Sequence, residues 1–494
     1  MNESVEQLDP TEELNAEGVN SKVKKGILIL TIRTFILQAV SFLANVIILP
    51  VLLSPAQYGV FFLVSAIINF LTYFSDIGFA AGLIQKKDKP SEKDLKTIFT
   101  AQQVMVVGII VSVLLATPFL KSFYKFDQLA INLLWALAFS LFLSSLKTIP
   151  SVLLERKLEF NKLVIPQIFE TIIFNLTVVY FAWRGFGVTS FTLGVLLRGI
   201  TGVIATYIVQ PWFPGLLFST ESFKSILKFG IPYQANTFLA MIKDDGMTIL
   251  LGGILGSSGV GLLGWAQKWA YAPLRFFMDQ VIKVTFPAYS RLQDNKEELS
   301  KAVSKSIFFI CLFVFPSLVL LVLLAPPLTQ IIPKYHKWAP ALIPLTLICL
   351  TSAFAAVTTP LTNMLNAIGK ISLTFKFMIM WTALTWALVP FLAYVYGING
   401  AGLGFAIVGV SSIVAMLKSL EFINLNYIEI LGKSLIGSII MGGLILLLRS
   451  ILPVSFVVVA SLGGGGLIFY ALLLFILEPT LLGMIKRGLR SKND

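Results

Sequence analysis

The stretch KDDGMTILLGGILGSSGVGLLGWAQKWAYAPLRFFMDQVIK, residues 243–283, decides the fold because it carries charges within otherwise uninterrupted membrane-type sequence. It holds seven charged residues, which are Lys243, Asp244, Asp245, Lys268, Arg275, Asp279 and Lys283. On a helix that turns about 100° per residue, the last four fall within about 80° of one another and form one polar stripe. A charge at the centre of a membrane helix costs roughly 2.5–3.5 kcal/mol, so we expect all seven to face one another or a water-filled cavity.

Apolar sequence extends from this stretch in both directions. The 494-residue chain is 56% hydrophobic and 13% charged, with a mean hydropathy of +0.86. Because a bilayer core about 30 Å thick requires about 20 apolar residues per helix, the sequence predicts an all-α polytopic membrane protein. About fourteen transmembrane helices are expected, over residues 26–49, 57–84, 97–120, 128–149, 163–184, 189–210, 223–251, 257–285, 302–325, 339–367, 371–396, 399–424, 431–448 and 453–477.

The basic residues predict the orientation of these helices. The net charge is +13, but Lys and Arg gather in alternate connections, as cytoplasmic loops require, and nucleic acid is not an expected partner. Lys22, Lys24 and Lys25 precede the first span, and residues 486–492 are also basic. We therefore expect both termini in the cytoplasm, with a disordered acidic tail over residues 1–25 that ends in these lysines, and a basic tail over residues 478–494.

Two short matches indicate an internal repeat. SPAQYG at residues 54–59 aligns with GSSGVG at 256–261, and TIP at 148–150 aligns with TTP at 358–360, with offsets of 202 and 210 residues. Two related halves about a central site are common in transporters. The sequence therefore predicts a six-helix N-lobe over residues 26–210 and a six-helix C-lobe over 211–424, related by pseudo-twofold symmetry, with two extra C-terminal helices over 425–477.

Polar residues elsewhere in the apolar segments are candidates for the same cavity. The candidate substrate-cavity residues are Arg33, Asp76, Arg198, Gln234, Lys243, Lys268, Tyr271, Arg275, Asp279 and Lys283. Asp76 is expected to share a helical face with Asn69, and Tyr271 could stack on a sugar ring or lie at the membrane interface. Arg33, Asp76 and Lys283 lie near the inner ends of their spans and could instead reach the interface. Asp279 could form a pair with Arg275 four residues earlier.

Three carboxylates are candidates for ion coupling, namely Asp244, Asp245 and Glu170. Lys243 could neutralise its neighbours in part, and a carboxylate without a partner in the membrane could carry H⁺ or Na⁺. His336 is the only histidine, and Cys311 and Cys349 lie in apolar runs without metal-binding spacing. The sequence also contains no GxxxxGK[ST], GxSxG or HExxH motif. No catalytic residue, metal site or cofactor is therefore predicted, beyond a coupling ion.

The chain resembles a known family over nearly its whole length. LPVLLSPAQYGVFFLVSAIINFLTYFSDIGFAAGLIQKKD, residues 49–88, resembles the opening of Wzx-type polysaccharide flippases. FGIPYQANTFLAMIKDDGMTILLGGILGSSGVGLLGWAQKWAYAPLRFF, residues 229–277, and FPAYSRLQ, residues 286–293, resemble the second-half signature of the WzxC/TuaB-like branch. This family belongs to the multidrug/oligosaccharidyl-lipid/polysaccharide exporter superfamily.

The resemblance implies a MATE-like fold whose two lobes surround a central cavity that opens alternately to each side. It implies a flippase of the bacterial cytoplasmic membrane that moves undecaprenyl-pyrophosphate-linked oligosaccharide to the outer leaflet, for capsule, exopolysaccharide, O-antigen or a related polymer. Membrane lipids, the polymerase and other polysaccharide-assembly proteins are the implied partners.

Two alternatives stay open. The first is an ion-coupled multidrug exporter of the same fold, with its ion site at Asp76, Asp244 and Asp245. The second is a membrane glycosyltransferase or ligase, which would need acid and base residues in sizeable outward loops. The outward loops expected here are short and contain few carboxylates.

Overall fold

The computed structural model describes residues 36–478 apart from Ile77 and Lys87, and within this range it leaves out the side chains of residues 225, 228–237, 280 and 283. All regular secondary structure in the described residues is helical, so the predicted all-α class is confirmed. The chain divides into two compact units between Val260 and Gly261. The lobe boundaries predicted from the repeat stay a prediction, and the two terminal tails fall almost entirely outside the described residues.

The described part of the first unit consists of helices joined by turns and by the non-helical segment of residues 210–219. They are the apolar helix Ile36–Leu52, which includes the π-helical turn η1 (Leu43–Ile48) and α2 (Leu49–Leu52), then α3 (Pro55–Thr72), η2 (Tyr73–Ser75), α4 (Phe79–Gln85), α5 (Glu92–Tyr124), α6 (Gln128–Leu146), α7 (Thr148–Arg156), α8 (Phe160–Trp183), α9 (Thr189–Val209), α10 (Thr220–Met241), the π-helical turn η3 (Ile242–Gly246) and the first part of α11 (Met247–Arg291). Ser54 and Ser91 begin α3 and α5 in capping boxes with Gln57 and Asp94, so the sequence itself fixes where both helices start.

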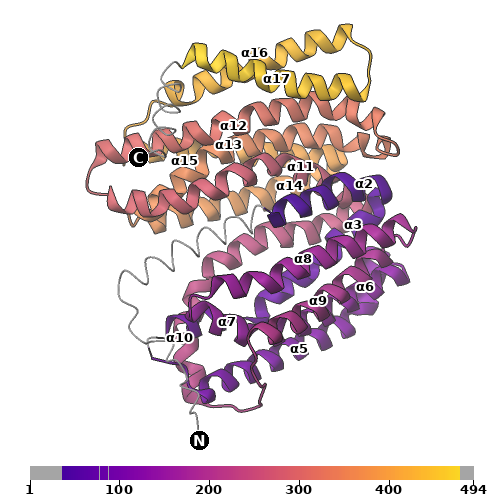
Figure 1. Ribbon diagram of the computed structural model, residues 1–494, viewed down its shortest axis with the longest axis vertical. Coiled ribbons are helices and arrows are strands. Elements are labelled where there is room, and N and C mark those ends of the chain that lie inside the picture. Colours follow the sequence, from indigo (N-terminus) through magenta and orange to yellow (C-terminus); the bar gives the residue numbers. More distant parts are fainter. Residues whose placement is uncertain (1–35, 77, 87, 479–494) are drawn as a thin grey trace, which may run out of the picture. The chain divides into compact units, whose positions relative to one another are not determined.

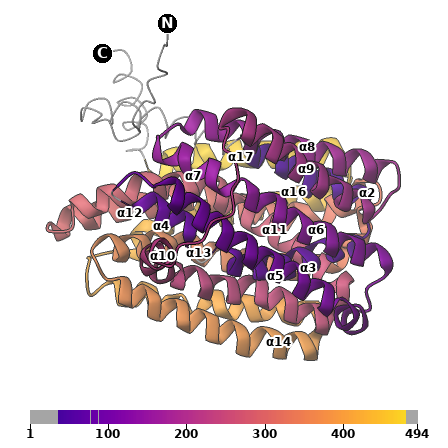
Figure 2. The same ribbon diagram turned by 90° about the horizontal axis from the view of Figure 1, so that it is seen from below.

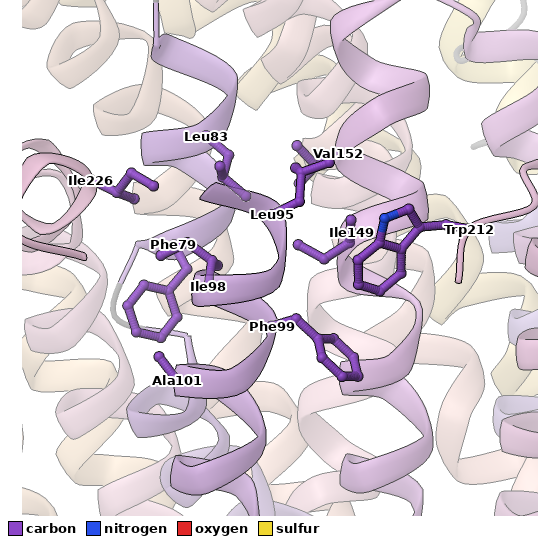
Figure 3. Packing of buried hydrophobic residues seen from close by; sticks show 10 residues of the cluster. All are labelled: Phe79, Leu83, Leu95, Ile98, Phe99, Ala101, Ile149, Val152, Trp212 and Ile226. Carbon is purple, nitrogen blue, oxygen red and sulfur yellow. The ribbon is translucent and has the colours of Figure 1, made fainter. Parts of the chain in front are cut away.

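A hydrophobic cluster holds the short helices α4 and α7 against α5 and α10 (Figure 3). Its buried members are Phe79, Leu83, Leu95, Ile98, Phe99, Ala101, Ile149, Val152, Trp212 and Ile226. Beside this cluster, Arg156 of α7 donates hydrogen bonds of 2.6–3.2 Å to the backbone carbonyl oxygens of Leu83, Ile84, Lys86 and Asp88. The last carbonyls of a helix lack intrahelical partners, so Arg156 stabilises the C-terminal end of α4.

Helices α8 and α9 lie side by side within the first unit (Figures 1 and 2). Small residues of α9 face its neighbours, because a Cβ added at Gly194 would meet Phe174 and Val178 of α8, and one added at Gly199 would meet Leu143 of α6. Membrane helices with small residues at their interface approach one another closely. Polar groups on α8 and α9 can therefore come into contact.

Up to Glu478, where the description ends, the second unit contains the rest of α11 and six further α-helices. They are α12 (Lys296–Ile331), α13 (Leu342–Ala367), which follows the 3₁₀ turn η4 (His336–Ala341), α14 (Ile371–Val410), α15 (Ile413–Ser419), α16 (Tyr427–Ile451) and α17 (Phe456–Leu477). The Ser352 hydroxyl of α13 donates a 2.8 Å hydrogen bond to the Ala270 carbonyl of α11. The ring of Trp265 stacks on that of Trp338, with 5.5 Å between centroids. These contacts hold α11 within its own unit from two sides, since Trp265 and Ala270 lie about 140° apart around the helix.

The last two helices, α16 and α17, lie side by side (Figure 1) and pack against α12. The buried side chains of this cluster are Leu324, Met441, Ile445, Val459, Leu462, Tyr470 and Leu474. The Tyr470 hydroxyl donates to the Leu312 carbonyl at 2.9 Å, and Arg449 donates to the Leu323 carbonyl at 3.0 Å. Both residues therefore stabilise the C-terminal pair against α12.

Among the described residues, eleven helices are long and apolar enough to cross a membrane. Two of them, Phe238–Asp279 and Ile371–Ser419, contain kinks at Gly256 and Gly397, where the sequence predicts connections between spans. The multi-pass membrane class is confirmed, and the count of fourteen stays a prediction. The single helix predicted over 57–84 is wrong, because the helical run from Pro55 ends at Ser75 and α4 begins only at Phe79.

Candidate functional site

The charges that open the 243–283 stretch lie in the π-helical turn η3, between α10 and α11. Lys243 forms an ion pair with Asp244, which partly neutralises the turn as the sequence suggests. The Asn69 side chain of α3 donates a hydrogen bond to the Asp245 carboxylate. Because π-helical turns are rare and often occur at functional sites, this turn is a candidate site in the first unit.

Asp76 caps a helix instead of lying on one. The chain leaves the helical conformation at Asp76, which has φ −137° and ψ 82°. Its Oδ1 accepts hydrogen bonds from the backbone N–H groups of Phe79 at 2.6 Å and Ala80 at 3.3 Å. An acceptor at this position stabilises the free amides that begin a helix. The predicted helical face shared with Asn69 is therefore wrong, whereas a cavity role for Asp76 stays a prediction.

Two residues predicted separately, Glu170 and Arg198, lie together between α8 and α9. The buried Glu170 carboxylate accepts a hydrogen bond from Lys147 Nζ at 2.5 Å, and its second oxygen lies 3.6 Å from Arg198 Nε. The Arg198 guanidinium carbon also lies 5.8 Å from the ring centroid of Phe174. Lys147 lies near the end of the span predicted over residues 128–149 and is not among the candidate site residues from the sequence, because only the packing of α8 reveals this contact.

The polar stripe lies on α11 in the second unit. Arg275 is exposed, and Lys268, Tyr271 and Asp279 are partly buried. The buried side chains of this part of α11 include Leu262, Leu263, Ala266, Ala270 and Leu274, which lie about 120–240° from Lys268 around the helix axis. From Ala266 onward the stripe therefore lies on the side of α11 away from the buried Ala266, Ala270 and Leu274, whereas the buried Trp265 lies about 60° from Lys268.

Three predicted residues cannot be placed. Arg33 lies outside the described residues, and the side chains of Gln234 and Lys283 are also outside the description. No cavity role is tested for these three residues.

Two open cavities lie elsewhere in the second unit. One of about 350 Å³ is lined by Glu297, Ser300, Lys301, Ser304, Lys305 and Asn424. Another of about 410 Å³ is lined by Leu420, Ile423, Asn424, Leu425 and Asn426. Neither is lined by a predicted site residue.

Known structures of membrane transporters share the fold. The structure of lipid II flippase MurJ in an inward closed conformation matches with a TM-score of 0.75 and 17% identity, covering 92% of this chain and 100% of that one. An inward-facing multidrug resistance MATE family transporter of the MOP superfamily matches with a TM-score of 0.61 and 17% identity, covering 80% of this chain and 97% of that one. The fold and the intramembrane charges thus define a polytopic α-helical protein of the MATE-like fold.

The sequence comparisons identify the family. A family model described as "Polysaccharide biosynthesis protein" matches residues 48–342, more than half of the chain, and the chain belongs to this family. It is 25% identical over 355 residues to the lipopolysaccharide biosynthesis protein WzxC of Escherichia coli K12, covering 71% of each chain. It is 22% identical over 357 residues to the succinoglycan biosynthesis transport protein ExoT of Rhizobium meliloti, covering 70% of this chain and 68% of that one. The resemblance stated from the sequence is confirmed.

Proposed function

We propose that this protein is a flippase that moves undecaprenyl-pyrophosphate-linked oligosaccharide from the inner to the outer leaflet of the bacterial cytoplasmic membrane by alternating access. The observation that carries the proposal is the stripe of Lys268 and Arg275, on the side of α11 away from the buried Ala266, Ala270 and Leu274, in a chain with the fold of a lipid flippase. Lys and Arg suit an anionic cargo, because a pyrophosphate forms strong charge-assisted hydrogen bonds with them. The named functions of WzxC and ExoT, in lipopolysaccharide and succinoglycan biosynthesis, support a polysaccharide precursor as the cargo.

The membrane geometry of the cargo also supports this assignment. A polyprenyl tail can stay in lipid while the charged and sugar-bearing head crosses through the protein, so only the head requires polar side chains in the membrane. Both termini would lie in the cytoplasm. The chain would act without an enzymatic step, with the polymerase and other assembly proteins receiving the cargo on the outer side.

Deleting the gene tests the function directly. A flippase defect should trap complete lipid-linked repeat units on the inner leaflet, which extraction and mass spectrometry of lipid-linked intermediates would detect. Incomplete repeat units would instead indicate a glycosyltransferase or ligase. Normal intermediates together with greater sensitivity to toxic cations would indicate a multidrug exporter.

Substitutions on α11 test the role of the stripe. Lys268→Ala or Arg275→Ala should lower surface polysaccharide roughly ten- to a hundredfold at normal protein levels, because each removes a charged hydrogen-bond donor from the cargo. Arg291→Ala, at the C-terminal end of the same helix, is the matched control. Unchanged polymer in both stripe variants would remove the stripe from the mechanism.

We also propose that Asp244 and Asp245 couple transport to an H⁺ or Na⁺ gradient. The π-helical turn and the hydrogen bond from Asn69 to Asp245 support this assignment, because they hold carboxylates at an irregular turn within an apolar span. If the pair couples ions, Asp245→Asn should abolish the gradient dependence of flipping in proteoliposomes. A dependence that persists in Asp244→Asn and Asp245→Asn would exclude both residues.

A further inference from the structure

The cluster around Glu170 carries more positive than negative charge. Lys147 and Arg198 share this single carboxylate, so the three groups have a formal net charge of +1 among their described contacts. Glu170 is buried, only 15% of the Lys147 side chain is exposed, and Arg198 lies near the middle of the apolar helix α9. An excess charge is costly inside a membrane. The cluster is therefore suited to receive one further anionic group.

Arg198 is oriented so that its guanidinium group can bind that anion. Glu170 contacts the Nε side of the guanidinium, and the ring of Phe174 lies against it. The Arg198 side chain is 53% exposed, and no hydrogen bond from its Nη1 or Nη2 atoms is found within the described part of the chain. A planar guanidinium held in this way presents two parallel donors, the geometry that suits a phosphate group.

Two further contacts hold this arrangement in place. Lys147 binds Glu170 Oε1, so the carboxylate is fixed from the side opposite Arg198. A Cβ added at Gly202 of α9 would lie 2.6 Å from Glu170 Cδ, which is closer than real Cβ contacts come. A larger residue at position 202 would therefore displace the carboxylate from the position it has here.

We propose that Arg198 binds the pyrophosphate of the substrate, and that Glu170, Phe174 and Gly202 are positioning residues that orient its guanidinium. This inference rests on the proposed function and assigns to Glu170 a role other than ion coupling. It assigns a phosphate-binding group within the first unit. The side chain that touches the cargo is Arg198, and the other three act through it.

Calorimetric titration of the purified full-length protein tests the proposal, with farnesyl pyrophosphate as the charged probe and farnesol as the neutral one. The wild-type protein should bind farnesyl pyrophosphate more tightly than it binds farnesol. Arg198→Ala should weaken the binding of farnesyl pyrophosphate roughly ten- to a hundredfold and leave farnesol binding unchanged. Arg198→Lys should keep only part of the wild-type affinity for the pyrophosphate, because lysine has the charge but not the planar pair of donors. Lys162→Ala, which breaks an ion pair with Glu159 near the start of α8, should match the wild type.

The direction in which Glu170→Gln changes the affinity for pyrophosphate separates a positioning role of Glu170 from simple charge balance. If Glu170 only balanced charge, its removal would strengthen pyrophosphate binding, because the cluster would become more positive. Positioning predicts binding several-fold weaker and an unchanged ion-gradient dependence of flipping. Since Glu170→Gln also leaves the Lys147 ammonium without its partner and could prevent folding, Gly202→Ala serves as a second variant that keeps every charge and displaces the carboxylate.

Four results would overturn the proposal. They are a wild type that does not distinguish the two probes, wild-type pyrophosphate binding in Arg198→Ala, tighter binding in Glu170→Gln, and wild-type binding in Gly202→Ala. Failure of the proposed function would appear separately, in the lipid-linked intermediates of the deletion strain. A deletion strain that traps complete repeat units, combined with any of these four results, would retain the flippase and reject the role of Arg198.

Discussion

Replacing Asp76 tests whether this residue serves the fold or the cargo. Its Oδ1 accepts two backbone hydrogen bonds at the start of α4, from Phe79 and Ala80, and α4 contributes the buried Phe79 and Leu83 to the core of the first unit. Loss of such a cap costs about 0.5–2 kcal/mol, and we expect the upper end because the cap joins a short helix to a buried cluster. At roughly 2–4 °C per kcal/mol for a unit of this size, Asp76→Ala should lower the unfolding temperature by about 4–8 °C.

The assay is thermal unfolding of purified protein in detergent, together with surface polysaccharide in cells. Asp76→Asn and Asp76→Ser keep a side-chain acceptor, so both should unfold near the wild-type temperature and support polymer export. Asp88→Ala, which changes an exposed carboxylate in the following connection, is the control. An Asp76→Asn protein of normal stability that exports no polymer would refute the capping explanation, because the charge itself would then be required.

Three further substitutions test packing and backbone geometry by the same unfolding assay. Arg156→Ala should lower the free energy of unfolding by about 2–3 kcal/mol, because it removes a charged donor from four carbonyl oxygens. Arg156→Lys should recover little of this stability, since lysine lacks the planar group of donors, and full stability of the lysine variant would contradict this explanation. Gly256 has φ 66° and ψ 177°, a conformation almost confined to glycine. Gly256→Ala should therefore lower the free energy of unfolding by about 1–3 kcal/mol, even though nothing lies within 4 Å of the new Cβ. An unchanged stability would mean that the kink is relaxed in solution. Met441→Ala, at a fully buried position, should cost about 2–5 kcal/mol, whereas Leu447→Ala, at a 59% exposed position of the same helix, should cost under about 0.5 kcal/mol; equal effects would argue against the packing of α16 on α12.

Hydrophobic run length and turn chemistry were sufficient to predict most of the membrane helices. The spans expected over 163–184 and 189–210 correspond to α8 (Phe160–Trp183) and α9 (Thr189–Val209) within a few residues. These helices are long, apolar and bounded by turns that the sequence marks. The continuous helix predicted over residues 57–84 does not include the break at Asp76. The sequence does contain a signal for this break, because an Asp two residues before a Gly favours a turn over a continuous helix.

The site was harder to predict than the helices. The spacing of the α11 stripe follows from helical periodicity, and the structure adds that Ala266, Ala270 and Leu274 are buried on the other side of the helix. The ion pair of Glu170 with Lys147 joins α8 to the turn between α6 and α7, and the small residues of α9 that let α8 approach form no motif of their own in the sequence. Such contacts depend on tertiary packing, which a single sequence does not encode in any local pattern.

The two π-helical turns also carry information about ancestry. A π-helical turn closes its hydrogen bonds over one residue more than an α-helical turn, so it is the structural mark of a residue inserted into a helix. The turns η1 and η3 begin at Leu43 and Ile242, about 200 residues apart, close to the offset of the repeated sequence matches. If the two halves descend from one duplicated gene, a single insertion before the duplication would account for both turns.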